Sequence, residues 1–522
     1  MYLRRPFSPL IFFALAVLGA GAFAFGQASI PTDDVTQESL RLAKVYALVE
    51  NNYVDAVNPD AAILEGGVRG MLSALDPFSA FFNEDQFELL RQQTRGRALG
   101  FGSVLYVTPG KVIVLDAAQL SPSQRAGLGP GDEIVEVNGQ RIDRLDFRSL
   151  VELLQRSRSH PVSLSVVHPG KVVTDFIKLD PAEVALPTVD VAFNLEPGIA
   201  YLHLTSFEAK TPQEVLDAVN HLGAKELNGL LLDLRDNHGG IIDTAVATVS
   251  LFLPPRLTVL TVKGRAASDV AYPTLPMPAR FEMPVIVLVN GNTASAAEIV
   301  AAALEEHDRA LIVGEPTFGK GVVEKVGPIG EKMGLALTSA QYFTPSGRSI
   351  QRPMPGTALE NPQAAANGTT NAQFRTDNGR PVVAGGGVTP DVAIPAAALD
   401  SWATFLDQRG IFTNFASDFL TRHARPSRSF EPDEQTLDDF HDFLLRHGIR
   451  APEEFWDQDR AFLKLRIQTE VINLIFGLTA GNEVETRGDP QVQKAAALFP
   501  KIPGLLNPPA SKPGAPAKEV GK

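Results

Sequence analysis

Two short segments contain residues that could form a hydrolytic pair. Ser295 follows the apolar run 285–289 and a Gly/Asn turn, and an alanine-rich stretch begins directly after it. Lys320 lies shortly downstream, between Gly319 and Gly321. A serine at the start of a helix has its hydroxyl beside backbone N–H groups that lack helical partners. Because a lysine in apolar surroundings can lose its proton near neutral pH, the pair predicts a Ser/Lys hydrolase.

The lysine segment also fits a second kind of site. Residues 314–320 match Gly-x-x-x-x-Gly-Lys, the phosphate-binding loop of nucleotide hydrolases. That loop continues with a serine or threonine that holds magnesium, whereas this chain continues with Gly321. Val322 and Val323 then predict a strand where the helix of a phosphate loop would begin. The sequence therefore favours the serine hydrolase over the nucleotide hydrolase.

The composition limits the partners and cofactors of the chain. Its 522 residues are 44% hydrophobic and have a net charge of −13, so we expect several cores and no nucleic-acid partner. There is no cysteine, and the nine histidines form no zinc-binding motif. We therefore predict that the enzyme uses neither a metal nor another cofactor.

The N-terminus resembles an export segment. Arg4 and Arg5 precede an apolar stretch over 10–24, which ends in the small-x-small sequence of residues 22–24. Residues 1–28 are therefore predicted to be a signal peptide or a membrane anchor, and both alternatives stay open. Either one predicts an exported, periplasmic or extracytoplasmic protein, and the second adds attachment to the inner membrane.

Hydrophobic periodicity divides the rest of the chain into five segments. Helical spacing predominates in 31–95, and short strands between Gly/Pro turns fill 96–182. Strands alternate with helices in 183–397, which predicts an α/β core. Aromatic and leucine residues recur at helical spacing in 398–500, and the Pro/Ala/Lys-rich residues 501–522 predict a disordered tail.

The same patterns predict individual elements. We expect helices over 36–50, 61–75, 212–222, 241–252 and 294–304. We expect strands over 111–115, 133–137, 162–167, 199–204, 230–234, 285–289 and 311–313.

Seven motifs occur along the chain in a recognisable order. They are LDPFS at 75–79, SPSQRAGLGPGD at 121–132, LDLRDNHGG at 232–240, NGNTASAAE at 290–298, GEPTFGKG at 314–321, YFTPSGR at 342–348 and GVTPD at 387–391. Together they resemble the carboxy-terminal processing peptidases, also called tail-specific proteases. The resemblance covers roughly residues 45–395. It implies an exported serine endopeptidase with a crotonase/ClpP-like α/β core, an inserted PDZ-type domain and polypeptide substrates with exposed C-termini.

The resemblance also implies roles for individual residues. Ser295 would be the nucleophile and Lys320 the general base, while the backbone N–H groups of Gly239 and Ala296 would hold the oxyanion. His238 stands where the family commonly has proline, and we interpret it as a turn residue rather than a third catalytic member.

The PDZ-type domain contains a candidate tail-binding loop. Leu99-Gly100-Phe101-Gly102 resembles the loop whose backbone N–H groups bind a peptide carboxylate, with the peptide added as an extra strand. Arg97 precedes the loop and would support the anion. The alternative is an ordinary β-turn beside a solvated arginine.

Glu324 is a departure from the family, which usually has glutamine four residues after the lysine. An ionised glutamate would favour the charged ammonium and oppose catalysis. Glu324 would then either be protonated or point away, toward Lys325 or solvent. The alternative function is a weak or inactive PDZ scaffold that presents substrates to another protease. The resemblance also allows a homodimer through the N-terminal or C-terminal helices.

Overall fold

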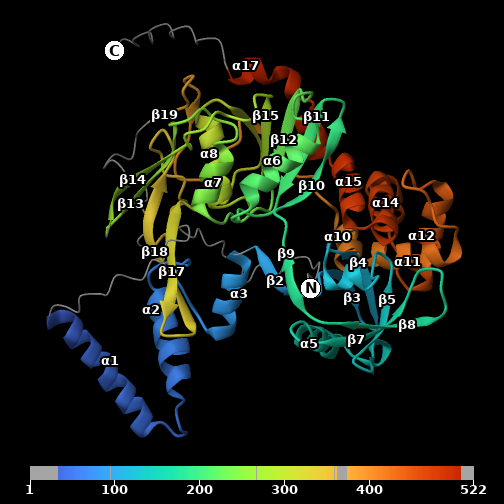
Figure 1. Ribbon diagram of the computed structural model, residues 1–522, viewed down its shortest axis with the longest axis horizontal. Helices are drawn as coiled ribbons and strands as arrows, with labels where there is room; N and C mark the ends of the chain where they lie inside the picture. The colour runs from blue at the N-terminus through green and yellow to red at the C-terminus, as the bar shows by residue number, and fades with distance from the viewer. Residues whose placement is uncertain (1–32, 95, 266, 358, 361–372, 507–522) are drawn as a thin grey trace, which may run out of the picture. The chain divides into compact units, whose positions relative to one another are not determined.

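The computed structural model describes residues 33–94, 96–265, 267–357, 359–360 and 373–506 (Figure 1). The predicted signal or anchor at 1–28 and residues 507–522 of the predicted tail lie outside these residues. The prediction of disorder from residue 501 onward is wrong for 501–506, which are helical and bury Ile502 and Leu506. Across the described ranges, no helix combines the length and the hydropathy needed to cross a membrane.

The chain folds into two compact units, each built from separate stretches of sequence. Among the described residues, one unit contains 96–195 and 395–494. The other contains 33–94, 196–394 and 495–506. The residues of the candidate Ser/Lys pair are therefore in one unit, and those of the candidate tail-binding loop are in the other.

The unit that contains Ser295 is built around a parallel sheet. Within this unit its strands are β11 (Ile199–Leu204), β12 (Gly229–Asp233), β15 (Val285–Val289), β16 (Ala310–Gly314) and β21 (Val392–Ala393), in that spatial order. Every residue of β12, β15 and β16 is buried, because other elements cover both faces of the sheet. These strands therefore have continuous apolar sequences rather than alternating ones.

Three helices connect these strands: α6 (Thr211–His221), α7 (Ile242–Val249) and α8 (Ala296–Glu306) (Figure 1). The predicted α/β order is confirmed, although the boundaries of these helices differ from the prediction by one to three residues. Helix α7 ends at Val249 rather than Phe252, and α8 begins at Ala296 because Ser295 has a non-helical backbone. All residues of α8 are buried.

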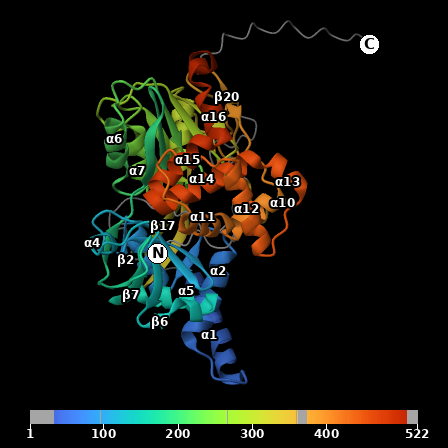
Figure 2. The same cartoon turned by 90° about the vertical axis from the view of Figure 1, so that its right-hand side faces the viewer.

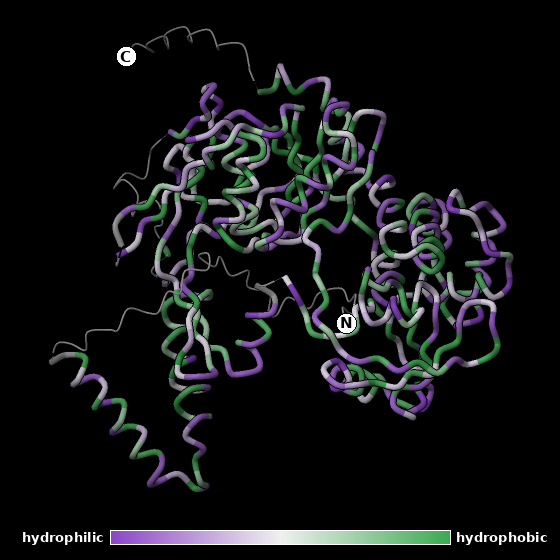
Figure 3. Tube along the Cα trace, in the orientation of Figure 1, coloured by the Kyte–Doolittle hydropathy of each residue, from purple (hydrophilic) through white to green (hydrophobic). Residues whose placement is uncertain are grey.

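An antiparallel sheet completes the core of this unit. It contains β1 (Ala80–Phe82), β18 (Met333–Phe343), β13 (Thr258–Gly264) and β14 (Ala267–Pro273), with β17 (Val322–Ile329) also paired to β18. The N-terminal helical elements are α1 (Asp33–Asn52), the π-helix η1 (Ala61–Val68), α2 (Arg69–Ser73) and α3 (Glu84–Thr94). Figure 3 shows hydrophobic and hydrophilic residues alternating along α1. A small hairpin pairs β19 (Phe374–Arg375) with β20 (Pro381–Val382).

The second unit contains the small β domain. Its sheet has the order β3 (Ser103–Thr108), β4 (Lys111–Ala117), β5 (Glu133–Val137), β7 (Val162–Val167) and β8 (Thr174–Leu179). Strand β6 (Gln140–Arg141) pairs with β5, and β2 (Arg97–Gly100) pairs with β9 (Ala182–Ala185). The helical elements are α4 (Pro122–Arg125), η2 (Ile142–Arg144) and α5 (Phe147–Ser157). The predicted strands 133–137 and 162–167 are confirmed at both ends.

The C-terminal region is helical, as predicted. It contains α10 (Ser401–Gln408), α11 (Ile411–Arg422), α12 (Glu434–Arg446), α13 (Glu453–Gln458), α14 (Arg460–Phe476), α15 (Leu478–Gly488), α16 (Pro490–Ala496), η3 (Phe499–Lys501) and α17 (Ile502–Leu506) (Figure 2). Strand β10 (Val189–Glu196) links the small β domain to the core along the chain. A cluster of phenylalanines from α11, α12 and α13, packed with aliphatic residues of α14, forms the centre of the helical region.

Candidate active site

Ser295 occupies the turn that joins β15 to α8. Its backbone has φ 57° and ψ −118°, a conformation that a residue with a side chain adopts only at a cost. The side chain is fully buried, and its hydroxyl has no hydrogen-bond partner among the described residues. The strained turn therefore places this hydroxyl at the start of α8, without a hydrogen bond to any residue that the structure describes.

Glu298 connects the serine turn to the lysine loop. Its Oε2 accepts hydrogen bonds from the backbone N–H groups of both Ser295 and Lys320, each at 2.9 Å. Its Oε1 accepts from the N–H of Gly319 at 2.8 Å and from the Thr317 hydroxyl. Since both nitrogens donate to the same Oε2 at 2.9 Å, the two nitrogens lie at most twice 2.9 Å apart. Burial raises the pKa of Glu298 to about 7, against the lowering effect of these hydrogen bonds.

Tyr342 connects the same two residues through their carbonyl groups. Its hydroxyl lies 3.1 Å from the Ser295 oxygen and 2.8 Å from the Lys320 oxygen. Burial, together with the nearby Glu298 and Glu324, raises the pKa of Tyr342 well above its ordinary value, so the phenol keeps its proton and donates it. Two side chains from different elements thus hold both candidate catalytic residues by the main chain.

Lys320 lies between β16 and β17 and is buried. Its Nζ is 4.8 Å from the centre of the Phe78 ring and 2.8 Å from Oε1 of Glu324, which is also fully buried. Of the two alternatives for Glu324, the one in which it points toward Lys325 or solvent is wrong. Residue 324 lies on β17, four positions along the chain from the lysine, and its side chain returns to the amine.

The glycine loop between β12 and α7 packs against the serine turn. A Cβ added at Gly239 would lie 2.8 Å from the backbone nitrogen of Ala296 and 2.8 Å from the Cβ of Ser295. Gly239 also has φ 99°, in the region that favours glycine. The positive φ and the lack of space for a Cβ both disfavour any other residue at this position. Because Gly239 has no side chain, its backbone can contact the start of α8.

Asn237 organises the glycine loop from the inside. Its buried side chain donates to the carbonyl of Leu204 and accepts, at 2.8 Å, the N–H of Gly239. The backbone carbonyl of Asn237 accepts a hydrogen bond from the N–H of Ala294 at 2.9 Å. The Gly239 N–H therefore already has a partner within the loop. His238 lies beside it in the same loop and is partly exposed.

The predicted tail-binding residues begin on β2. Leu99 and Gly100 end this strand, and Phe101 and Gly102 follow it. Arg97 pairs with Glu183 on β9 at 2.7 Å, with both side chains more than half exposed. Gly102 has φ 79°, and an added Cβ would collide with the side chain of Ser121.

A second arginine approaches this loop and was missed by the sequence analysis. Arg158, directly after α5, donates from Nε to the carbonyl of Leu99 at 3.1 Å. Its side chain also lies 3.7 Å from the position of a Cβ added at Gly100. No sequence signal identified it, because Arg158 follows the loop by more than fifty residues. The spacing of Ser295 and Glu298, in contrast, matches a helix capping box and could have identified Glu298.

Comparisons with known sequences agree with this architecture. Residues 198–358 match peptidase family S41, residues 113–167 match the PDZ domain, and residues 24–86 match the activating protease CtpB N-terminal domain. A carboxy-terminal-processing protease of Bartonella bacilliformis is 32% identical over 361 residues, which are 66% of this chain and 80% of the relative.

Two further comparisons are with more distant proteins. Carboxy-terminal processing protease CtpB of Bacillus subtilis is 29% identical over 60% of this chain and 65% of the relative. The solved structure of a photosystem II D1 C-terminal processing protease is 25% identical, covers 69% of this chain and 87% of its own, and has a TM-score of 0.37.

Proposed function

Because this chain belongs to the carboxy-terminal processing protease family, and is thus a serine-type peptidase with a PDZ domain that acts on polypeptides, we propose that it is an exported endopeptidase with a Ser295–Lys320 dyad. In this proposal the PDZ domain recognises the C-terminal tail of the substrate. The shared contacts of Ser295 and Lys320 with Glu298 are the observation that most supports the dyad.

The proposed reaction has two halves. Lys320 takes the proton of the Ser295 hydroxyl, and the oxygen attacks the scissile carbonyl carbon. The backbone N–H groups of Ala296 and Gly239 stabilise the oxyanion, and the Gly239 group shares its proton with Asn237. The lysine ammonium then protonates the leaving amine. Water hydrolyses the acyl-enzyme with the same lysine as base, so the reaction as proposed requires neither metal nor organic cofactor.

Glu324 determines the charge of the proposed base. A carboxylate 2.8 Å from Nζ favours the ammonium, whereas full burial disfavours two charges in the same pocket. We propose that Glu324 is protonated when Lys320 acts as the base. The contact also supports the alternative function, a PDZ scaffold whose lysine stays charged and which presents substrates to another protease.

Tail recognition would use the edge of the PDZ sheet. Strand β3 is the terminal strand of its sheet, and no described strand pairs with its outer edge. A substrate tail would add there as a further strand and place its carboxylate at the loop of residues 99–102. Arg158 is already at this loop, whereas Arg97 would first have to exchange Glu183 for the substrate.

The decisive experiment measures cleavage of an unfolded protein with an apolar C-terminal tail. The full chain should cleave it, and Ser295→Ala should lower kcat by at least about a thousandfold, since no other group replaces the nucleophile. Ser73→Ala, an exposed serine on α2, is the matched control and should retain full activity. Equal activity in Ser295→Ala and the parent chain would exclude the serine mechanism. Absence of cleavage by the parent, with the tail still bound, would favour the scaffold.

A further inference from the structure

Strand β4 of the PDZ domain has both of its faces buried. Val112 and Val114 belong to the core of the PDZ domain. Ile113 and Leu115, which point to the opposite face, belong instead to the phenylalanine cluster of the C-terminal helices. This sheet face would be open to solvent if the PDZ domain stood alone. The helical region therefore forms a further layer on the PDZ sheet (Figures 1 and 2).

The neighbouring strand β3 is held in the same way. Leu105 belongs to the PDZ core, and Val107 packs against that core. Val104 and Tyr106 pack against the helical cluster. The two faces of β3 are thus covered by different parts of the chain, and its outer edge is the side that remains for a peptide.

A specific contact fixes β3 to the turn between α10 and α11. The Tyr106 hydroxyl donates to the carbonyl of Gly410 at 2.8 Å. Gly410 has φ 63°, and a Cβ added there would collide with the Tyr106 hydroxyl. Burial and the charge of Glu470 raise the pKa of Tyr106, while a hydrogen bond with Thr413 opposes this, so the phenol stays protonated. The turn fits the tyrosine closely enough to exclude any residue other than glycine.

Further contacts fix the adjacent strand and turn. Lys111 at the start of β4 donates to the Ser417 hydroxyl on α11 at 2.8 Å. At the other end, a Cβ added to Gly131 would lie 2.6 Å from the carbonyl oxygen of Leu474 on α14. The helical layer therefore contacts β3, β4 and the turn before β5.

We infer that the C-terminal helical region is a structural layer of the tail-binding unit, which holds β3 ready to accept a substrate tail, with Tyr106 as a positioning residue. The inference rests on the proposed function, because it takes β3 as the strand to which tails add. An edge strand with one neighbour would lose backbone conformational entropy at every residue if it became ordered only on binding. A strand ordered in advance avoids that loss, and the peptide binds more tightly.

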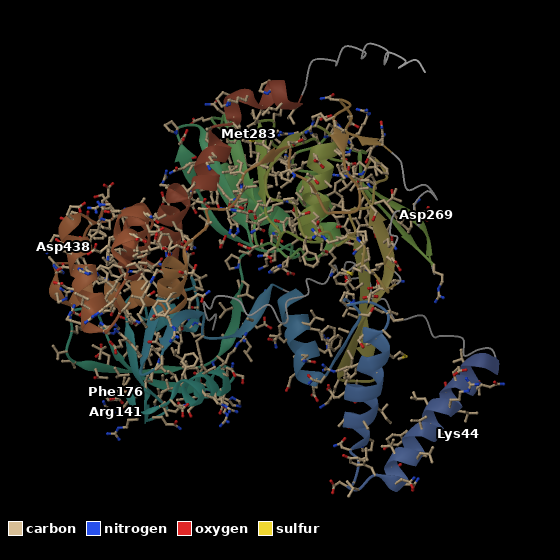
Figure 4. The ribbon with its side chains drawn as sticks, turned by 180° about the vertical axis from the view of Figure 1, so that it is seen from behind. Lys44, Arg141, Phe176, Asp269, Met283 and Asp438 are labelled. Atoms are coloured by element: carbon tan, nitrogen blue, oxygen red, sulfur yellow. The ribbon has the colours of Figure 1, made fainter. Side chains whose placement is uncertain are left out.

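The test measures binding rather than cleavage. The full chain with Ser295→Ala is titrated with a fluorescent peptide that ends in apolar residues and a free carboxylate. Tyr106→Phe in this background should raise Kd about fivefold, which corresponds to one ordinary hydrogen bond. Gly410→Val, which displaces the tyrosine, should raise it further. Asp438→Asn is the control on the same helical region, since Asp438 is exposed on α12 away from the PDZ sheet (Figure 4).

Hydrogen exchange of β3 provides a readout that needs no peptide. Amides of residues 103–108 should exchange faster in Tyr106→Phe than in Asp438→Asn. Unchanged Kd and unchanged exchange in Tyr106→Phe would overturn the inference, as would an equal loss of binding in Asp438→Asn. If the proposed function were wrong, the cleavage assay would show it, because cleavage would persist in Ser295→Ala. The two results are independent, because binding is measured in a chain without the nucleophile.

Discussion

At the scale of single residues, the candidate site depends on side chains that hold others in place. Glu298 accepts the N–H groups of Ser295 and Lys320, and Tyr342 contacts the carbonyl groups of both. The main chains of the two residues are therefore fixed from both sides, whatever their side chains do. This arrangement makes the reactivity of Ser295 sensitive to residues that would not themselves touch the substrate.

Replacement of Glu324 tests whether its charge restrains the base. Glu324→Gln keeps the shape and removes the carboxylate beside Nζ, so Lys320 becomes easier to deprotonate. We expect kcat to rise severalfold and the pH optimum of kcat to fall. The measurement is a pH–rate profile against Glu331→Gln, an exposed glutamate, as control. A profile that stays in place would show that Glu324 carries no charge in the resting enzyme either, so that it does not restrain the base.

Replacement of Tyr342 tests the clamp on the carbonyl groups. Tyr342→Phe removes the hydroxyl that lies 3.1 and 2.8 Å from the two oxygens. We expect kcat to fall by about tenfold with KM unchanged, because the two residues lose alignment while substrate binding stays intact. Tyr53→Phe, at an exposed tyrosine, is the control. A change in KM alone would contradict the positioning role.

At the scale of elements, the site forms where loops at the ends of parallel strands meet. The loops after β12, β15 and β16 contain Gly239, Ser295 and Lys320, and parallel strands bring their carboxyl ends to one edge of the sheet. Asn237 then joins the first loop to the second through its carbonyl. These loops approach one another closely, and glycine permits this because it has no side chain.

Gly239→Ala tests this close approach. The added Cβ would meet the Ala296 nitrogen and the Ser295 Cβ at 2.8 Å, so the serine turn must move. We expect kcat to fall by at least about a hundredfold. Gly330→Ala is a matched control, because Gly330 also has positive φ but an added Cβ there would have no neighbour within 4 Å. Similar losses in both variants would mean that backbone strain, and not contact with the serine turn, causes the effect.

At the scale of the whole molecule, several buried carboxyl groups affect stability. Burial raises the pKa of Glu208, Glu298 and Glu305 from 4.5 to about 7. Between these two values the folded chain holds protons that the unfolded chain has released. These groups therefore make the free energy of unfolding decrease as the pH rises from about 4.5 to about 7.

Glu208 is the simplest of the three to test. Its Oε2 is buried without a hydrogen-bond partner in the described part of the chain, and burial alone shifts its pKa. The difference in the free energy of unfolding between Glu208→Gln and the parent should shift in favour of the variant by about 1–3 kcal/mol from pH 5.5 to pH 8. Thermal or denaturant unfolding at the two pH values measures this difference, with Glu331→Gln as control. If the stability difference between variant and parent were the same at both pH values, the raised pKa of Glu208 would be contradicted.

The sequence by itself determined the family, the α/β core, the PDZ domain and the residues proposed for catalysis. These follow from local patterns, since a buried parallel strand such as β15 is continuously apolar and a turn such as 290–295 has a characteristic composition. Only the tertiary structure decided that Glu324 faces Lys320, that Tyr342 clamps the pair and that Arg158 reaches Leu99. It also decided that the C-terminal helices cover the PDZ sheet. The physical reason is that an amphipathic helix shows in its sequence that it has an apolar face, but not which distant surface that face will cover.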